Sequence, residues 1–205
     1  MSAPVDVAVV VPIKSFALAK ARLADSLSPD SRRQLARQCA EAVLLAAAPL
    51  PVYVVCDDDE VAAWARAKGA SVVIPTAPGL NAAATTGRSA TREAGHRRVM
   101  VVHSDLPHAK DLASLCTVPA DVVVVPDRHG DGTNVFLLPC DGDFSFCYGP
   151  GSSAAHRSEA TRHGWSVEVV QRDDLALDLD TPDDLQMAGF TVATPSLHQP
   201  IVDRP

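Results

Sequence analysis

The chain has 205 residues, of which 47% are hydrophobic and 21% are charged. A chain of this length fits one domain and can bury a core without a disulfide framework or a structural metal. Its formal net charge of −7 counts against a nucleic-acid-binding protein and against a polybasic membrane-surface protein. A small anionic substrate remains compatible with this charge, because it needs only a local cluster of cations and backbone N–H groups.

The sequence carries no signal for membrane insertion or export. No run reaches the roughly 20 apolar residues that a membrane span requires. The N-terminus lacks a basic region and carries Asp6 where a signal peptide is apolar. The five cysteines are odd in number and form no C-x-x-C motif, which indicates reduced, buried thiols. We therefore expect a cytoplasmic protein that binds neither nucleic acid nor membrane.

Val-rich apolar runs alternate with helical patterns along the whole chain. Near-continuous apolar runs are typical of parallel strands that are covered on both faces. The expected strands are residues 5–11, 52–56, 72–74, 99–102, 122–125, 134–138 and 167–170. The expected helices are residues 29–46, 58–68, 79–94, 107–116, 152–163 and 182–188. This order predicts an α/β three-layer sandwich on a mostly parallel sheet. We expect one domain over residues 1–190 and a Pro-containing extension over 191–205.

The first strand is followed by a loop with three cations, which are Lys14, Lys20 and Arg22. In open α/β sheets, ligands bind beyond the carboxyl ends of the strands, so this loop is a candidate binding segment. Its charge would suit a polyphosphate, although it has neither the G-x-G-x-x-G nor the Walker pattern. A solvated amphipathic turn explains the same residues equally well.

Three acidic residues at other strand ends are candidate metal ligands. Asp105 directly follows the fourth strand, where it is placed either to bind a metal or to cap the next helix. Asp178 and Asp180 share one face of an extended segment, and adjacent carboxylates repel unless a cation holds them. Oxygen ligands without Cys or His suit Mg²⁺. We interpret the flanking His103 and His108 as structural, because no zinc-binding spacing supports them.

Two turns are candidate contacts for a substrate anion. Thr133 and Asn134 follow a turn with two glycines, so the hydroxyl and the amide either face a ligand or simply begin a hairpin strand. The Gly-Pro-Gly-Ser turn from Gly149 to Ser152 opens a helix, where free N–H groups and the helix dipole favour a phosphate or carboxylate. The alternative interpretation of this turn is a helix start capped by Ser152.

Several segments occur in an order that resembles one known family. These segments are Val11-Pro12-Ile13-Lys14, Ala19-Lys20-Ala21-Arg22-Leu23, Gly79-Leu80-Asn81, Asp105-Leu106-Pro107, Asp131-Gly132-Thr133-Asn134, Tyr148-Gly149-Pro150-Gly151-Ser152 with His156, and the run 178–185 from Asp178 to Leu185. Together they resemble the guanylyltransferases of coenzyme F-420 (deazaflavin) biosynthesis, which act on 2-phospho-L-lactate or phosphoenolpyruvate. The resemblance covers residues 9 to about 185.

The resemblance implies a nucleotidyltransferase fold similar to that of the nucleotide-diphospho-sugar transferases, with GTP as co-substrate and Mg²⁺ as cofactor. It makes Asp105, Asp178 and Asp180 the metal ligands. It makes Lys14, Lys20 and Arg22 the catalytic cations over the triphosphate. It makes Thr133, Gly149 and Ser152 contacts to the acceptor. The turn at Asn134 is a further candidate for substrate binding. The candidate contacts to guanine are strand-end backbone groups near Val11 and side chains near Asn81. Ala21 departs from the Ser or Thr expected in the basic loop.

The acceptor and the reaction leave alternatives open. Phosphoenolpyruvate and 2-phospho-L-lactate differ by planarity and two hydrogens, which the sequence does not distinguish. An Ala-, Arg- and Val-rich composition favours a high-GC genome and, by association, phosphoenolpyruvate. A nucleotidyltransferase for another acceptor and a glycosyltransferase with an Asp-x-Asp metal site are alternatives within the enzymes. A nucleotide-binding module without catalysis is the alternative outside them. The oligomeric state cannot be read from the sequence.

Overall fold

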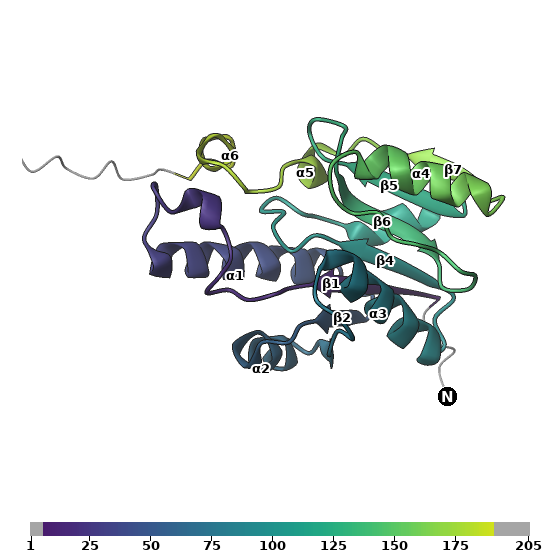
Figure 1. Ribbon diagram of the computed structural model, residues 1–205, viewed down its shortest axis with the longest axis horizontal. Coiled ribbons are helices and arrows are strands. Elements are labelled where there is room, and N and C mark those ends of the chain that lie inside the picture. Colours follow the sequence, from purple (N-terminus) through teal and green to yellow (C-terminus); the bar gives the residue numbers. More distant parts are fainter. Residues whose placement is uncertain (1–5, 191–205) are drawn as a thin grey trace, which may run out of the picture.

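A computed structural model describes residues 6–190 of the chain, and over that range seven strands form one sheet (Figure 1). The strands are β1 (Val7–Pro12), β2 (Val52–Val55), β3 (Ser71–Val73), β4 (Arg98–Val102), β5 (Val122–Pro126), β6 (Thr133–Pro139) and β7 (Val167–Val169). Their spatial order is β3-β2-β1-β4-β6-β5-β7. The order places β1 and β4 at the centre, which explains why both are almost continuous runs of buried Val and other apolar residues.

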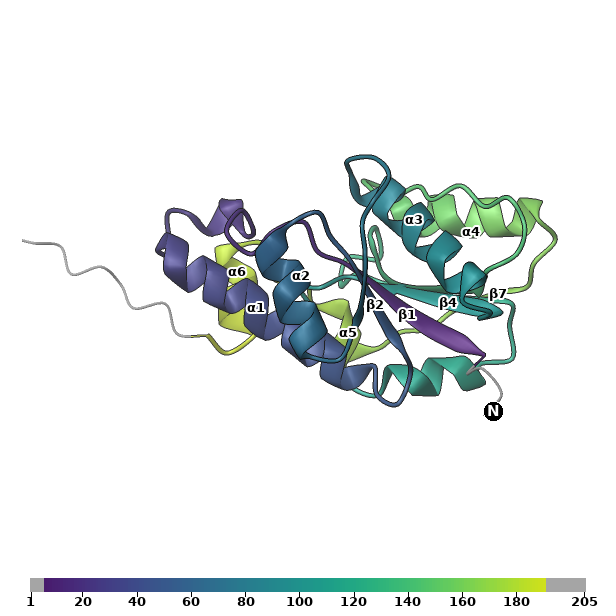
Figure 2. The ribbon, with the colours of Figure 1, turned by 90° about the horizontal axis from the view of Figure 1, so that it is seen from below.

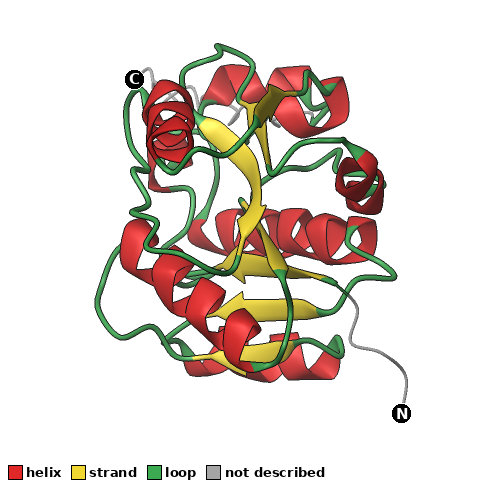
Figure 3. Ribbon diagram, turned by 90° about the vertical axis from the view of Figure 1, so that its right-hand side faces the viewer, coloured by secondary structure: helices red, strands yellow, loops and turns green. Residues whose placement is uncertain are grey.

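Helices cover both faces of this sheet (Figures 2 and 3). They are α1 (Pro29–Ala46), α2 (Asp59–Ala67), α3 (Leu80–Glu93), α4 (Ser152–Arg162), α5 (Asp173–Ala176) and α6 (Pro182–Met187), with 3₁₀ helices η1 (Ala21–Leu23) and η2 (Leu112–Thr117). One core cluster joins the sheet to α1, α2, η2 and α5. A second joins the opposite face to α3 and α4. The predicted three-layer sandwich is confirmed.

The sheet is parallel except at β6. Strand β1 runs parallel to β2 and β4, β2 to β3, and β5 to β7, whereas β6 is antiparallel to both β4 and β5. The short turn between β5 and β6 forces this reversal, because parallel neighbours need a long crossover. Asp127 closes the turn by accepting the N–H groups of His129 and Asp131, both at 3.0 Å. The start of β6, with Thr133, therefore lies at the edge where β1 and β4 end.

The helix expected at residues 107–116 is a wrong prediction. The chain passes through turns there and enters η2 only at Leu112. The apolar residues of this stretch recur every three positions, as Leu106, Ala109, Leu112 and Leu115, and all four are buried. A spacing of three keeps side chains on one face of a 3₁₀ helix, whereas on an α-helix it drifts slowly around the axis. Asp111, with a φ of 37°, precedes η2 in the left-handed region.

Some predicted elements differ from the structure in their bounds, and two short helices were not predicted. The short elements η1 and α5 were not predicted, since neither has enough residues to show a helical period. The first strand begins at Val7. Residues 1–5 and the predicted extension at 191–205 lie outside the described residues.

Candidate active site

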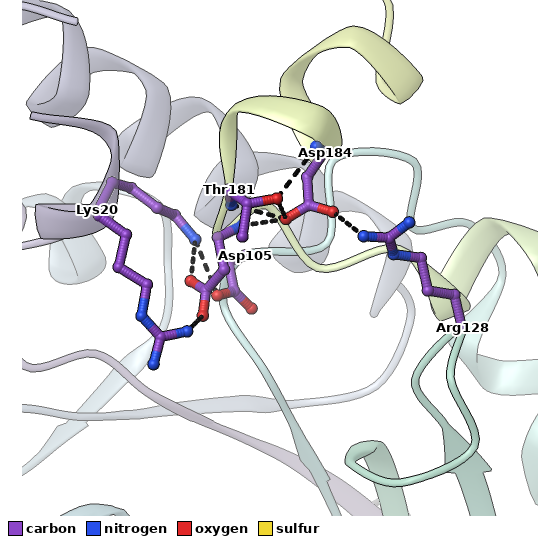
Figure 4. Close-up of polar contacts among 7 residues, drawn as sticks. Lys20, Asp105, Arg128, Thr181 and Asp184 are labelled. Atoms are coloured by element: carbon purple, nitrogen blue, oxygen red, sulfur yellow. Dashed lines mark hydrogen bonds and ion pairs between the residues drawn. The ribbon is translucent and has the colours of Figure 1, made fainter. Parts of the chain in front are cut away.

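A buried lysine links two of the predicted metal ligands. The Lys20 side chain is only 5% exposed, and its Nζ lies 2.8 Å from Asp105 Oδ2 and 3.7 Å from Asp180 Oδ1. Arg22 Nη1 lies 3.3 Å from Asp180 Oδ2 at the rim of the same cluster. Figure 4 shows the side chains of Lys20 and Asp105 meeting beside the segment that carries Thr181 and Asp184. The structure therefore brings the basic loop and two of the acids together.

The loop that carries Lys20 is shaped by its backbone and by one hydrophobic contact. Lys20 itself takes up the left-handed region, with a φ of 58°, directly before η1. Leu23, at the end of η1, is fully buried in a small cluster with α1 and with Leu179 and Leu185. This cluster holds the segment after β1 against the segment that carries the C-terminal acids, so the ammonium of Lys20 turns inward.

The acidic segment 178–180 is fixed to the end of β4. The Leu179 N–H donates to the backbone oxygen of Asp105 at 3.1 Å, and the Leu179 side chain is fully buried. Because neighbouring side chains of an extended chain alternate, burying Leu179 directs Asp178 and Asp180 away from the core. Turns follow Asp105 in the chain, so its side chain does not cap a helix. Its backbone anchors the segment that carries the other two acids.

Asp184 is a positioning residue that sequence reasoning missed. Its buried carboxylate accepts the N–H groups of Asp180 at 3.0 Å and Thr181 at 2.6 Å, and the guanidinium of Arg128 at 2.6 Å (Figure 4). The sequence shows a signal for part of this arrangement, because Thr181 and Asp184 have capping-box spacing. The contact with Arg128, 56 positions away, has no local signal.

The charges of the cluster shift the pKa values of its members. Burial disfavours the Asp105 carboxylate, but Lys20 outweighs this effect and holds the pKa of Asp105 below its usual value. Burial lowers the pKa of Lys20, while Asp105 and Asp180 more than compensate and raise it. Burial, and then the negative charge of Asp105, raise the pKa of Asp178. The three acids are therefore close enough to repel, and only Asp105 and Asp180 contact the ammonium.

The oxygen atoms at this edge fit Mg²⁺, although no complete site is formed in advance. Among residues 6–190, the His, Cys, Asp and Glu side chains form no group of three already arranged to hold a metal ion. The Lys20 ammonium contacts Asp105 and Asp180 where a shared cation would bind them. Asp105 Oδ1 is buried and has no hydrogen-bond partner in the described chain. Carboxylate oxygens suit Mg²⁺, and Lys20 would have to move for the acids to share one ion.

The two predicted acceptor hydroxyls lie together under the surface. Thr133 Oγ1 receives the Ser152 hydroxyl at 3.2 Å and lies 3.1 Å from His156 Nδ1. The Cys147 N–H donates to His156 Nε2 at 2.9 Å, so the proton of a neutral ring must lie on Nδ1. Burial lowers the pKa of His156 to about 4, which keeps the ring neutral. Thr133 Oγ1 therefore accepts two hydrogen bonds and still has its own proton to donate.

Most N–H groups of the Gly149–Ser152 turn already have protein partners. The Gly151 N–H donates to Asp131 Oδ2 at 2.9 Å, and the Ser152 N–H donates to the Gly149 oxygen at 3.1 Å. Gly151, not Ser152, is the N-cap of α4. Gly149 is exposed, with a φ of 136°, and its N–H has no partner within residues 6–190. Of the predicted anion donors in this turn, Gly149 is the one that stays open.

Two predicted ligand-facing amides bind backbone groups. Asn81 Oδ1 accepts the Tyr148 N–H at 2.7 Å, and its Nδ2 donates to the Tyr148 oxygen at 3.4 Å. Asn134 Nδ2 donates to the oxygens of Leu175 at 2.9 Å and Ala176 at 3.0 Å. Asn81 therefore ties α3 to the residue before the Gly149–Ser152 turn, and Asn134 ties β6 to α5. Both amides position the site instead of facing an open pocket.

Two adjoining pockets open at the carboxyl edge of the sheet. One, with a volume of about 210 Å³, is lined by Lys14, Lys20, Asp105 and Asp180 among others. The other, of about 270 Å³, lies between the ends of β1 and β2 and the start of α3. Ile13 and Lys14 line both. The two pockets therefore share a wall, and charged side chains line the first while mostly apolar ones line the second.

Comparison with known proteins identifies the family of this chain. The family model described as "Guanylyl transferase CofC like" matches residues 7–189, which include every acid, cation and turn described above. The chain belongs to this family. The resemblance seen in the sequence is confirmed, and the chain is a nucleotidyltransferase.

Other guanylyltransferases are similar over most of their length. The phosphoenolpyruvate guanylyltransferase of Rubrobacter xylanophilus is 37% identical over 184 residues, which cover 86% of this chain and 90% of the relative. The phosphoenolpyruvate guanylyltransferase of Conexibacter woesei is 39% identical over 197 residues, covering 90% of this chain and 88% of the relative. The similarity therefore extends over whole proteins of this family and is not confined to one motif.

Solved structures confirm the predicted nucleotidyltransferase fold. A crystal structure from Desulfovibrio desulfuricans, assigned to the nucleotide-diphospho-sugar transferases, has a TM-score of 0.72 at 16% identity and covers 93% of this chain and 89% of that one. A nucleotidyl transferase from Methanothermobacter has a TM-score of 0.60 at 16% identity and covers 89% of this chain and 96% of that one. Within residues 6–190, no helix is long and apolar enough to span a membrane.

Proposed function

We propose that this guanylyltransferase joins the GMP unit of GTP to phosphoenolpyruvate and releases pyrophosphate, as a step of coenzyme F-420 biosynthesis. The observation that carries the proposal is the cluster in which Lys20 bridges Asp105 and Asp180 beside two joined pockets. The names of the relatives favour phosphoenolpyruvate over 2-phospho-L-lactate as acceptor. We also propose a cytoplasmic location and one catalytic domain over residues 1–190.

The proposed reaction is an in-line displacement at phosphorus. A phosphate oxygen of the acceptor attacks the α-phosphorus of GTP, a new P–O bond forms, and the bond to the β-phosphate oxygen breaks. Such transfers depend on positioning and charge neutralisation more than on covalent catalysis. The acceptor phosphate is already ionised near neutral pH, so the attack needs no general base. Pyrophosphate leaves with the electron pair of the broken bond.

The cations and acids of the charged pocket have separate roles in this proposal. Lys14, Lys20 and Arg22 neutralise the triphosphate. Asp105, Asp178 and Asp180 would hold Mg²⁺, which when bound supplies further charge neutralisation at the phosphates. The orphaned Oδ1 of Asp105 supports this assignment, because a buried carboxylate oxygen without a partner is costly. The Lys20 ammonium, once displaced from Asp105 and Asp180, is free to turn toward phosphate oxygens.

The acceptor is proposed to bind at Thr133, Gly149 and Ser152. The Gly149 N–H is open, and the Thr133 hydroxyl proton is available because its oxygen already accepts two hydrogen bonds. Ser152 is buried and donates to Thr133, so it supports the Thr133 hydroxyl at the same time. These donors suit an anion that carries both a carboxylate and a phosphate.

Incubation with GTP, Mg²⁺ and each acid in turn, with mass detection of the product, tests the proposal. We expect a guanylylated phosphoenolpyruvate, a smaller amount or none of the 2-phospho-L-lactate product, and no product in the presence of EDTA. Release of a nucleoside diphosphate in place of pyrophosphate would instead indicate a glycosyltransferase. Bound but unchanged GTP with every acid would indicate a binding module and would contradict the proposal.

A further inference from the structure

We propose that Asp57 selects guanine by accepting hydrogen bonds from its N1–H and its 2-amino group. This inference rests on the proposed function, because it assigns the apolar pocket to the base of GTP. The pocket adjoins the charged pocket through Ile13 and Lys14, so a nucleotide with its phosphates at Lys20 would extend its base into it.

The second pocket has the character of a nucleobase site. Its lining residues are Pro12, Ile13, Lys14, Val55, Cys56, Asp57, Pro75, Ala77, Pro78, Gly79, Leu80 and Ala83. Ten of these twelve residues are apolar or glycine, and Asp57 carries the one acidic side chain among them. Its volume of about 270 Å³ is below the roughly 300–1,000 Å³ typical of drug-sized ligands, which suits a smaller, flat group.

Asp57 is the member of a run of three acids that lines this pocket. Asp58 caps α2, where its Oδ1 accepts the Val61 N–H at 3.0 Å, and Asp59 lies in the first turn of that helix. Asp57 lies two residues after the end of β2, is exposed, and makes no hydrogen bond or ion pair with the rest of residues 6–190. The main chain beside it is fixed, because the Cys56 N–H donates to the Val73 oxygen at 3.0 Å.

The amide of Asn81, a further polar side chain near this pocket, is not available to a base. Asn81 lies one residue beyond the pocket-lining Leu80, but its amide oxygen and nitrogen both bind the Tyr148 backbone. We therefore expect guanine to be bound at the wall of the pocket that carries Asp57, and not by the side chain of Asn81. Lys14 offers only donors, so Asp57 is the acceptor that a guanine edge requires.

The chemistry of a carboxylate separates guanine from the other purines. A carboxylate accepts two parallel N–H bonds, which matches the N1–H and 2-amino group of guanine. Hypoxanthine has the N1–H without the amino group and makes one bond fewer. Adenine presents a lone pair at N1, which a carboxylate repels. An amide side chain, in contrast, offers one acceptor and one donor and so matches the N6–H and N1 of adenine.

Affinities and turnover with GTP, ITP and ATP test the assignment in the full-length protein. For the wild type we expect kcat/KM and affinity about tenfold higher for GTP than for ITP, the effect of one hydrogen bond to a charged group. Asp57→Ala should bring the GTP-to-ITP ratio close to one. Asp57→Asn should lower the GTP-to-ATP ratio by at least tenfold. Asp59→Asn is the matched control, with the same charge change on the same segment, and should leave every ratio as in the wild type.

The outcomes separate this inference from the proposed function. If the wild type neither binds nor turns over any nucleoside triphosphate, the proposed function fails. If the wild type prefers GTP and both Asp57 variants keep the wild-type ratios, only the role of Asp57 is wrong. A wild type that treats GTP and ITP alike also overturns it. Binding by calorimetry and the melting temperature are measured on each variant, so a loss of folding is seen directly.

Discussion

The contacts of Lys20 in the structure differ from the role that the proposed function gives it. Its ammonium contacts Asp105 and Asp180, whereas the proposed function requires it to face phosphate once Mg²⁺ binds. Its burial and its left-handed backbone direct the ammonium toward the two acids. The sequence predicted a phosphate-binding cation at Lys20. It gave no indication of the contacts with the two acids, because the contact with Asp105 spans 85 positions.

Replacing Lys20 by Met should destabilise the protein and strengthen metal binding. Removing the ammonium leaves Asp105 without its partner and Asp180 with Arg22 alone. We expect a loss of about 2 kcal/mol, below the ~3–5 kcal/mol of a fully buried pair, because the side chains of Asp105 and Asp180 are 24% and 45% exposed. Mg²⁺ should restore most of the loss, since it binds the folded state. Urea denaturation with and without Mg²⁺ measures both effects.

Arg22→Met is the control for this experiment. Arg22 is 76% exposed and contacts only Asp180, so its removal should change the unfolding free energy by at most about 0.5 kcal/mol. If Lys20→Met behaves like Arg22→Met in the absence of Mg²⁺, the ammonium does not hold the acids together and the prediction for Lys20 is wrong.

His156 should make the folded state sensitive to acid. Its pKa falls from 6.5 to about 4 on folding, so the unfolded chain binds the proton first as the pH falls. The stabilisation is complete above pH 6.5 and is lost as the pH falls to about 4. At 1.36 kcal/mol per pKa unit, the loss is of the order of 3 kcal/mol. Denaturation at a series of pH values measures this slope.

His156→Phe should flatten the slope between pH 6.5 and 4, because the titrating group is gone. It should also raise the KM for the acceptor, since Thr133 loses the hydrogen bond from Nδ1, and should leave the KM for GTP unchanged. The aromatic ring keeps the stacking on Phe136, which lies 4.5 Å away between ring centroids. An unchanged slope in this variant would show that other groups cause the acid sensitivity.

At the scale of the elements, helix α3 connects the two substrate regions. Its first residues line the apolar pocket, Asn81 binds the acceptor turn, and Gly87 lies against the central strand β1. The sequence predicted the helix and its bounds within one residue at each end. The close contact of Gly87 with the sheet could not be predicted, because the local sequence shows only that glycine is a weak helix former.

Gly87→Ala should push α3 away from the sheet. An added Cβ would lie 2.4 Å from Val10 Cγ1 and 3.0 Å from Val55 Cγ2, which packing does not allow. We expect a loss of about 1–3 kcal/mol of stability and weaker GTP binding, even though Ala favours a helix by about 1 kcal/mol over Gly. Thermal denaturation and GTP titration measure the two effects. Adding Val10→Ala should recover part of both. If the double variant is no more stable and binds GTP no more tightly than Gly87→Ala, the contact between the added Cβ and Val10 does not cause the loss.

Secondary structure with a clear period was predictable, and short irregular segments were not. Strand β6 was predicted from its apolar run, but its antiparallel direction follows from the turn chemistry of Asp127. The prediction of a helix at residues 107–116 was wrong because a spacing of three is close to the helical period of 3.6 residues. Only the tertiary packing distinguishes the two. The direction of β6 matters for the proposed function, since it brings Thr133 to the edge where Asp105 and Lys20 lie.

At the scale of the whole molecule, the topology assembles the site from distant residues. Arg22 and Asp180 are 158 positions apart, and Thr133 meets His156 across two elements. The sequence predicted that strand ends would carry these residues, because parallel strands end at one edge. It could not predict that Asn81 and Asn134 bind backbone groups, since an amide pairs as readily with a loop as with a ligand.

The net charge of −7 does not oppose an anionic substrate, because three cations lie at this edge. Lys14 and Lys20 line the charged pocket, and Arg22 contacts Asp180 at its rim. Local charge therefore decides what binds, and the overall charge excludes only partners with extended negative surfaces.

Phosphorus NMR of one reaction mixture tests the central claim most directly. With GTP, phosphoenolpyruvate, Mg²⁺ and the wild-type protein, we predict equal amounts of pyrophosphate and of a new diphosphate that links guanosine to the acceptor. The variant Asp180→Asn should give neither product, and its melting temperature should show that it is folded. Formation of GDP or free phosphate in place of pyrophosphate, or full turnover by Asp180→Asn, would contradict the account.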